Sequence, residues 1–323
     1  MPPADLSIAA VQFEHRDGDK PYNLGRIAAL SAQAAAAGAK VVSFHECSIS
    51  AYSFAQSLTK PQLLEIAEPV PDGPSVRRLS DIAATHVIYL LAGLFERDGD
   101  RVFNTYVCVG PQGFIARHRK LHAFVNPHIS SGDEFTLFDI AGWRCAILIC
   151  YDNNLPENVR IAALRGARIV FMPHVTGCLP STMPGRGVVD PALWHNRAHD
   201  PVRLRQELNG PKGRGWLMRW LPARAWENGV YAVFSNPIGL DHGEVRNGNA
   251  MLLDPFGEVL CECHELDDDF CVGLVTADKL EAASGHRYLR ARRPELYAPL
   301  TAPSDLPPLT QPGWRLDPPN DAP

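Results

Sequence analysis

Short apolar runs alternate with amphipathic segments along most of the chain, and this pattern predicts the first elements. Residues 6–13 and 40–44 are apolar runs with strand character, and the Ala- and Leu-rich segment 22–37 lies between them and ends at Gly38. The order predicts a strand, a helix and a strand. Because a helical crossover joins the two strands, we expect them to pair in parallel.

The pattern then changes from a helical crossover to hairpins. After a predicted helix at 75–85, apolar runs at 87–95, 102–109 and 114–118 are separated by turn sequences containing glycine. Two further runs form a predicted hairpin, at 136–140 and 144–149. Crossovers followed by hairpins predict mixed sheets, in which some neighbours are parallel and others antiparallel.

The second half of the chain repeats these signals, with one exception. We predict helices at 158–165, 216–228 and 279–293, and strands at 167–172, 230–235, 249–254, 258–263 and 270–276. Residues 176–215 show little periodicity, which is uncommon for a loop of this length unless it is functional. This segment is interpreted as a lid, an oligomer contact or surface padding. We expect one domain at 1–300 and a proline-rich tail at 301–323.

Composition narrows the class of protein. The chain has 323 residues, of which 46% are apolar and 21% charged, and a net charge of −5. This balance gives no reason to expect nucleic acid or an anionic membrane as a partner. The first residues lack the pattern of a signal peptide, and no apolar run approaches the roughly 18 residues of a membrane span. A cytoplasmic location is therefore expected.

The eight cysteines are scattered through apolar segments. In a chain of this length without a signal peptide, they do not indicate a disulfide framework. Cys261, Cys263 and His264 lie close in sequence, but the two cysteines share one face of a predicted strand and no second ligand pair has matching spacing. Structural zinc sites usually combine paired clusters, so no metal is predicted.

Cys150 follows the apolar run 144–149 and precedes a predicted helix start. At such a strand-to-helix turn, the sulfur would lie near backbone N–H groups and the positive end of a helix, which favour thiolate and can hold an oxyanion. A nucleophile is one interpretation, and an ordinary core cysteine is the other.

Two other polar residues lie near predicted strand ends. Glu46 follows the strand 40–44, at the edge where open α/β folds place ligand sites, although an exposed loop carboxylate would show the same pattern. Lys120 lies in the basic run 117–122. Basic runs are usually solvated surface, so Lys120 alone does not indicate a site.

Three separated segments, at 44–46, 119–122 and 148–152, resemble the Glu, Lys and Cys signatures of the carbon–nitrogen hydrolase, or nitrilase, superfamily. Four further segments also resemble it in the same order, at 223–228, 235–237, 249–257 and 292–297. The resemblance implies an α/β fold, a four-layer αββα sandwich with two mixed sheets. It also implies a homodimer or higher homo-oligomer, and catalysis without metal or organic cofactor.

The resemblance also assigns roles. It makes Cys150 the nucleophile, Glu46 the base and Lys120 the charge that holds the oxyanion, with the backbone N–H of Tyr151 as a second donor. Many members carry a second glutamate before the cysteine strand, whereas here its position falls near Val125 or Asn126. Residues that we expect to contact substrate are Tyr52, Asn126, His174, Trp194 and Glu227.

The residues after the cysteine bear on the reaction. True nitrilases typically have Trp-Glu there, whereas this chain has Tyr151-Asp152, which resembles the amidase and carbamoylase branches. Asn153 and Asn154 stand where carbamoylases often place arginines that bind a carboxylate. We therefore expect a small-molecule amide or N-carbamoyl substrate without a strong demand for a carboxylate. The alternatives are a true nitrilase and a non-catalytic binding protein on this fold.

Overall fold

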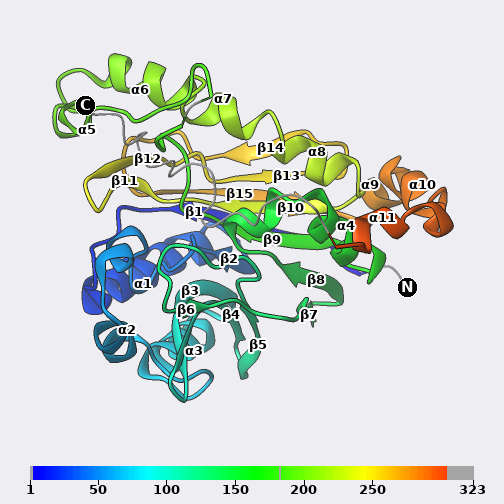
Figure 1. Ribbon diagram of the computed structural model, residues 1–323, viewed down its shortest axis with the longest axis horizontal. Coiled ribbons are helices and arrows are strands. Elements are labelled where there is room, and N and C mark those ends of the chain that lie inside the picture. Colours follow the sequence, from blue (N-terminus) through cyan, green and yellow to red (C-terminus); the bar gives the residue numbers. More distant parts are fainter. Residues whose placement is uncertain (1–2, 182, 304–323) are drawn as a thin grey trace.

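Two stacked β-sheets form the centre of the protein, for which a computed structural model describes residues 3–181 and 183–303 (Figure 1). The first sheet has the order β15-β1-β2-β3-β4-β5, with β6 beside β4. Its strands are β1 (Leu6–Gln12), β2 (Val41–Ser43), β3 (Tyr89–Asp98), β4 (Arg101–Gly110), β5 (Gly113–Arg119), β6 (Ile129–Ser130) and β15 (Asp269–Val275).

The second sheet has the order β14-β13-β10-β9-β8-β7, and a separate hairpin pairs β11 with β12. These strands are β7 (Leu137–Ile140), β8 (Trp143–Ile147), β9 (Ile169–Pro173), β10 (Tyr231–Ser235), β11 (Ile238–Asp241), β12 (Glu244–Asn247), β13 (Met251–Leu253) and β14 (Val259–Glu262). Both sheets mix parallel and antiparallel neighbours, as predicted.

Helices lie around the two sheets, and not all of them cover an outer face. They are α1 (Lys20–Ala36), α2 (Lys60–Ile66), α3 (Pro74–His86), α4 (Pro156–Leu164), α5 (Pro191–His195), α6 (Pro201–Asn209), α7 (Arg214–Leu217), α8 (Leu221–Trp226), α9 (Ala277–Ala282), α10 (Gly285–Arg290) and α11 (Ala298–Thr301). Short 3₁₀ turns are η1 (Ser53–Ser57), η2 (Cys150–Asn153) and η3 (Pro294–Leu296). In Figure 1, α1 and α3 lie on one side of the stacked sheets and α8 on the other.

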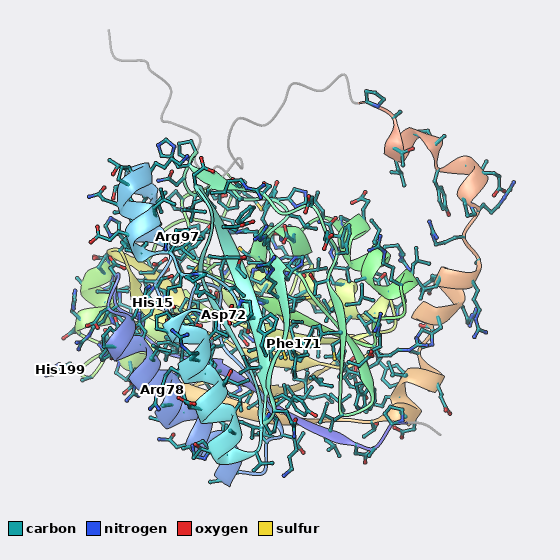
Figure 2. All side chains as sticks on the ribbon, turned by 90° about the horizontal axis from the view of Figure 1, so that it is seen from below. His15, Asp72, Arg78, Arg97, Phe171 and His199 are labelled. Atoms are coloured by element: carbon teal, nitrogen blue, oxygen red, sulfur yellow. The ribbon has the colours of Figure 1, made fainter. Side chains whose placement is uncertain are left out.

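Three buried clusters hold these layers together. One lies between the sheets and joins Ile8 and Leu91 of the first sheet to Phe171 of the second. Another packs α1 and α3 on the first sheet, and a third packs α4 and α8 on the second. Phe171 accordingly lies deep in the protein in Figure 2, whereas Arg78 of α3 lies at the surface. This is the predicted four-layer αββα sandwich.

The predicted β-α-β start is confirmed, since β1 and β2 pair in parallel across α1. The Asp19 side chain caps α1 by accepting a hydrogen bond from the N–H of Tyr22, which satisfies one unpaired donor of the first turn. The hairpin β7–β8 is also confirmed, and its turn places Ala141 and Gly142 at positive φ.

The prediction that 176–215 lacks regular structure is wrong. It contains α5 and α6, and α7 begins at its end. Each of the first two helices has an Asp-Pro start, in which Asp190 or Asp200 caps the helix and a proline occupies its first turn. This is a known helix-start signal, and these helices were missed because they are short and their apolar periodicity is weak.

Two predicted helices are split, and one hairpin was missed. Residues 216–228 divide between α7 and α8, because Pro222 in the first turn of α8 cannot continue an earlier helix. Residues 279–293 divide into α9 and α10. The hairpin β11–β12 turns at His242 and Gly243, both at positive φ, a geometry that usually takes Asn-Gly or Asp-Gly.

Within residues 3–181 and 183–303, no helix has the length and apolar character needed to cross a bilayer. Most of the predicted proline-rich tail, residues 304–323, lies outside the described residues.

Gly93 of β3 allows the chain after β2 to pass close to the first sheet. A Cβ atom at Gly93 would lie 2.3 Å from the backbone nitrogen of Cys47, which directly follows Glu46. The backbone N–H of Ile49 also donates to the carbonyl of Gly93. The missing side chain therefore fixes where Glu46 leaves the sheet.

We expect Gly93→Ala to lower the free energy of unfolding by about 1–3 kcal/mol, because backbone must move to admit the methyl group. The matched control is Gly25→Ala in α1, where nothing lies within 4 Å of the added Cβ and alanine favours the helix. Urea unfolding measures both variants. Equal stability of the two would contradict the close approach at Gly93.

Candidate active site

Glu46, Lys120 and Cys150 lie together although they come from different strands. Glu46 follows β2, Lys120 follows β5 and Cys150 follows β8. The Nζ of Lys120 donates to the Oε1 of Glu46 at 2.7 Å, and the Cys150 thiol is hydrogen-bonded to Glu46. All three are buried. The fold thus brings the three sequence-predicted residues into contact, with Glu46 touching both others.

Cys150 occupies a strained turn. Its φ is +50°, in the left-handed region that non-glycine residues rarely adopt. The strand β8 ends at Ile147 and η2 begins at Cys150, so the chain passes from a strand into a 3₁₀ turn within three residues. The first N–H groups of such a turn have no partner within it, and Tyr151 supplies one of them. A sharp turn of this kind presents the sulfur and a backbone donor at the same place.

Three donors hold Glu46 in position. Its Oε1 accepts from the Nδ2 of Asn104 at 2.6 Å as well as from Lys120. Its Oε2 accepts from the backbone N–H of Val175 at 3.1 Å. Asn104 lies on β4 and carried no sequence signal, since a single asparagine within an apolar strand is not typical of a site. Both oxygens of this buried carboxylate therefore have hydrogen-bond partners, as buried polar groups require.

Lys120 keeps its positive charge in this buried position. Burial alone would lower its pKa, but the carboxylate of Glu46 and other nearby acidic groups raise the pKa of Lys120 well above its usual range. The Tyr52 hydroxyl lies 3.3 Å from the Nζ, and the rings of Tyr52 and Phe124 lie around it. Basic runs are usually solvated surface, but Lys120 itself is buried.

The Cys150 thiol rests in its protonated form. Burial, reinforced by the carboxylate of Glu46, raises the pKa of Cys150 to about 12, although Lys120 acts in the opposite direction. A thiolate therefore forms only if its proton moves as the nucleophile reacts. Glu46 is hydrogen-bonded to the thiol and can accept that proton, which is general-base activation of a nucleophile.

Asp152 connects the Lys120 segment to the cysteine turn. Its carboxylate accepts from the backbone N–H groups of Leu121 at 3.2 Å, His122 at 3.0 Å and Ile149 at 3.1 Å. The Nδ1 of His122 lies 2.8 Å from the same carboxylate. Burial would raise the pKa of Asp152, but His118, whose Nε2 lies 3.7 Å away, and the hydrogen-bonded His122 lower it below its usual range. Asp152 thus holds the Lys120 segment and the cysteine turn together, and we call it the clamp.

A cavity of about 460 Å³ opens beside Cys150. Its wall combines residues around the cysteine with residues of the segment 175–186. Trp216 of α7 and Trp220, just before α8, complete it. The lining residues are Tyr52, Ser53, Phe124, Cys150, Tyr151, Asn154, Val175, Thr176, Leu179, Ser181, Met183, Arg186, Trp216, Trp220 and Arg246. Its volume is in the range typical of small-molecule sites.

Of the residues expected to contact substrate, only Tyr52 lies in this wall. The Asn126 side chain instead donates to the backbone carbonyls of Ala55 and Leu58, both at 2.8 Å. His174 is buried behind the wall, between the rings of Trp220 and Phe234, and its Nε2 lies 3.2 Å from the Nδ2 of Asn153. Both residues support the site from outside the cavity.

Trp194 and Glu227 also lie outside the cavity wall. The Nε1 of Trp194 donates to Glu14 at 3.0 Å, and its ring packs with α6 and the hairpin β11–β12. Glu227 accepts from Arg224 at 3.2 Å. The placement of these two residues in the substrate pocket is therefore corrected. Trp216, Trp220, Arg186 and Arg246 were missed, since their segments carried no pattern that points to a site.

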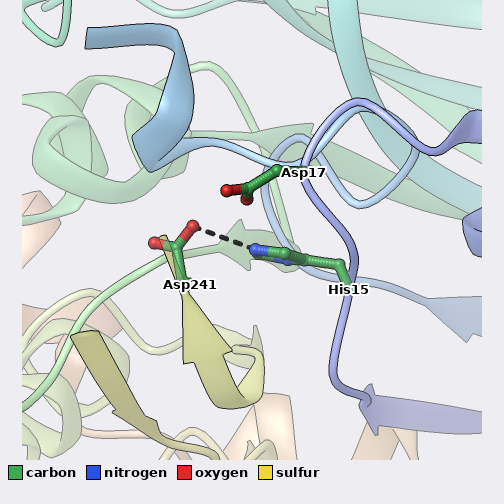
Figure 3. Close-up of side chains that lie close together, drawn as sticks. All are labelled: His15, Asp17 and Asp241. Carbon is green, nitrogen blue, oxygen red and sulfur yellow. Dashed lines mark hydrogen bonds and ion pairs between the residues drawn. The ribbon is translucent and has the colours of Figure 1, made fainter. Parts of the chain in front are cut away.

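A cluster of His15, Asp17 and Asp241 has the donor atoms of a metal site, as Figure 3 shows. However, the Nε2 of His15 already lies 3.0 Å from Asp241 and its Nδ1 lies 2.8 Å from His45. Asp241 also accepts from Ser53 and Arg246. Hydrogen bonds therefore already occupy the atoms of His15 and Asp241 that could bind a metal. The cluster is better explained as a hydrogen-bonded network than as a cation site.

Comparisons with known proteins show the family of this chain. The carbon–nitrogen hydrolase family model matches residues 7–284. An (R)-stereoselective amidase from Pseudomonas sp. is 32% identical over 293 residues, covering 89% of this chain and 92% of that protein. A nitrilase from Pyrococcus abyssi is 28% identical over 276 residues, covering 84% and 90%, and an omega-amidase from Homo sapiens is 31% identical over 257 residues, covering 75% and 79%.

A solved structure shares the fold. The amidase from Nesterenkonia sp. AN1, in complex with acrylamide, superposes with a TM-score of 0.68 at 22% identity, covering 91% of this chain and 97% of that one.

The fold and the matched family define an enzyme that hydrolyses carbon–nitrogen bonds. The chain belongs to the carbon–nitrogen hydrolase family, in the amidase branch of the nitrilase superfamily.

We expect Asp152→Asn to destabilise the protein by about 1–3 kcal/mol, because one carboxylate oxygen that accepts N–H groups becomes a donor. It should also reduce hydrolysis, since it loosens the link between Lys120 and Cys150. Asp139→Asn is the control, because Asp139 forms only an exposed ion pair with Arg144. Chemical denaturation measures both. A D152N protein as stable as D139N would contradict the clamp.

Stability should also depend on pH through His174. Burial, with Lys120 nearby, lowers the pKa of His174 to about 3. Below about pH 6.5, His174 binds a proton in the unfolded state but not in the folded state. The free energy of unfolding therefore falls as the pH falls from about 6.5 towards 3. His174→Gln should reduce this slope by at most about 1.4 kcal/mol per pH unit, a limit approached towards pH 5.

Denaturation at several pH values between 5 and 7 measures the slope. His199→Gln is the control, since His199 lies at the surface in Figure 2 and should leave the slope unchanged. The same slope in H174Q and the native chain would show that His174 is not held neutral.

Proposed function

We propose that this enzyme hydrolyses an amide or N-carbamoyl bond of a small molecule through a thioester on Cys150. The observation that carries the proposal is the position of the Glu46 carboxylate, which contacts both the Cys150 thiol and the Lys120 ammonium. One carboxylate can then exchange a proton with the nucleophile while a fixed cation stands beside it.

In the first half of the reaction, Glu46 takes the proton of the Cys150 thiol as the sulfur attacks the carbonyl carbon. The carbonyl oxygen becomes an oxyanion, which Lys120 and the backbone N–H of Tyr151 stabilise. The carbonyl then re-forms and the C–N bond breaks. Protonated Glu46 returns its proton to the departing nitrogen, which leaves as ammonia or an amine.

In the second half, water attacks the thioester and Glu46 accepts a proton from that water. The C–S bond breaks, and Cys150 leaves as a thiol by recovering the proton from Glu46. An amide yields a carboxylic acid, and an N-carbamoyl compound yields a carbamic acid. Asn104 and Val175 hold Glu46 in place throughout, because each donates to one of its oxygens.

The related proteins support this choice of chemistry. Two of the relatives are described as amidases, and solved structures of the Nesterenkonia amidase show covalent addition at its active-site cysteine. The nitrilase from Pyrococcus abyssi keeps nitriles as a second candidate substrate class. The cysteine, lysine and glutamate in contact argue against a protein that only binds its ligand.

A panel of small amides, N-carbamoyl compounds and nitriles tests the proposal, with release of ammonia or amine as the measurement. We expect hydrolysis of amides or carbamoyl compounds. Cys150→Ala should abolish it, and Lys120→Met should reduce it about 100- to 1,000-fold, because one oxyanion donor is lost. Cys178→Ala is a control for loss of a buried thiol outside the cavity wall.

If the enzyme hydrolyses nitriles but no amides or N-carbamoyl compounds, it is a true nitrilase and the proposed reaction is wrong. Unchanged amide hydrolysis by C150A would contradict the nucleophile, whereas inactivity of wild type and all variants alike would contradict the reaction class tested.

A further inference from the structure

Arg186 contributes a positive charge to the cavity wall and has no acidic partner. Among the described residues, no hydrogen bond or ion pair reaches its guanidinium, and its Nε is buried without a partner. The contact that it does make is with the ring of Trp216, whose centroid lies 4.0 Å from the guanidinium carbon. Half-buried arginines are normally paired, because an uncompensated charge loses solvation.

The rest of the wall does not neutralise this charge. None of the described residues that line the cavity is aspartate or glutamate. The other lining cation, Arg246, is already paired with Asp241 at 3.0 Å and with Glu244 at 2.7 Å. Arg246 therefore brings its own counter-charges, whereas Arg186 does not. An anion entering the cavity would meet one free cation and no fixed negative charge in the wall.

The backbone fixes Arg186 at this place. Gly185 and Gly187 on either side have φ of +82° and +140°, and the N–H of Arg186 donates to the carbonyl of Met183 at 3.0 Å. These contacts form a tight turn at residues 183–187. Stacking on Trp216 restricts the long side chain as well, so less freedom is lost when a ligand binds.

We propose that Arg186 binds a carboxylate of the substrate, so that the enzyme prefers small amides that also carry an anionic group. The proposal rests on the proposed function at Cys150 and adds the substrate class. A guanidinium presents paired N–H groups that match the two oxygens of a carboxylate. Apolar residues of the same wall, among them Leu179 and Trp220, suit a hydrocarbon spacer between the amide and the carboxylate.

A preference for a carboxylate differs from the expectation in the sequence analysis. That expectation was based on Asn153 and Asn154, which stand where carbamoylases often place the arginines that bind a carboxylate. The cation comes instead from the segment 176–215, which showed no periodicity in the sequence. That segment therefore has a wall-forming role at its start, where Leu179, Ser181, Met183 and Arg186 line the cavity.

Matched pairs of substrates test the proposal. Each pair contains a straight-chain monoamide of a dicarboxylic acid and the amide in which a methyl group replaces the carboxylate. We expect wild type to have a kcat/KM about 10- to 100-fold higher for the carboxylate member, the range for a charged hydrogen bond. Added salt should weaken this preference by screening the charge.

Arg186→Met should remove the preference, mainly by raising KM for the carboxylate member, and leave the methyl member within about 3-fold of wild type. Arg186→Lys should recover part of it, because the charge returns without the paired geometry. Arg78→Met, at the surface of α3, is the control and should match wild type. Thermal unfolding of each variant checks that the fold is intact.

The outcomes separate the two proposals. If wild type hydrolyses no amide and no N-carbamoyl compound of the panel, the proposed function fails and this inference fails with it. If it hydrolyses other members of the panel but neither member of any pair, only the inference about Arg186 is overturned. If wild type hydrolyses the methyl members equally well or better, or if R186M slows both members equally, the inference about Arg186 is overturned and the proposed function stands.

Discussion

The buried ion pair between Glu46 and Lys120 is the interaction on which the site depends. Two charges removed from water lose several kcal/mol of solvation each, and their attraction repays this only with good geometry and further hydrogen bonds. Here the Nζ–Oε1 distance is 2.7 Å, and Asn104 and Val175 satisfy the remaining acceptor sites of Glu46. Loss of either charge would leave the other buried and unpaired, at a cost of about 3–5 kcal/mol.

The fold brings this pair to the cysteine by using strand ends. Glu46, Lys120 and Cys150 follow β2, β5 and β8, so both sheets contribute to one site. The clamp at Asp152 then sets the distance between the segments, since its carboxylate accepts from N–H groups on both. The strained φ of Cys150 is held by these surroundings, and the thiol lies beside Glu46.

Sequence patterns predicted the β-α-β start and the mixed sheets, because helical crossovers and glycine turns leave local signals. The four layers and the roles of Glu46, Lys120 and Cys150 were implied by the resemblance of separated segments to a family, since the local pattern left each of these residues open. Parallel strands joined by a helix, and hairpins joined by glycine turns, produce periodicities that can be read directly. The wall of the cavity left no such signal. Asn104 is a single asparagine in a buried strand, and Arg186 lies in a segment whose structure depends on Asp-Pro helix starts and long-range packing. Trp194 was placed wrongly, because a tryptophan near a histidine indicates burial without saying in which cluster.

The thioester intermediate is the central claim, and partitioning between water and hydroxylamine tests it most directly. A common acyl-enzyme on Cys150 gives the same ratio of hydroxamate to acid from amides that share an acyl group but release different amines. Cys150→Ala should give neither product. A ratio that changes with the departing amine would mean that no common intermediate forms, and it would contradict nucleophilic catalysis by Cys150.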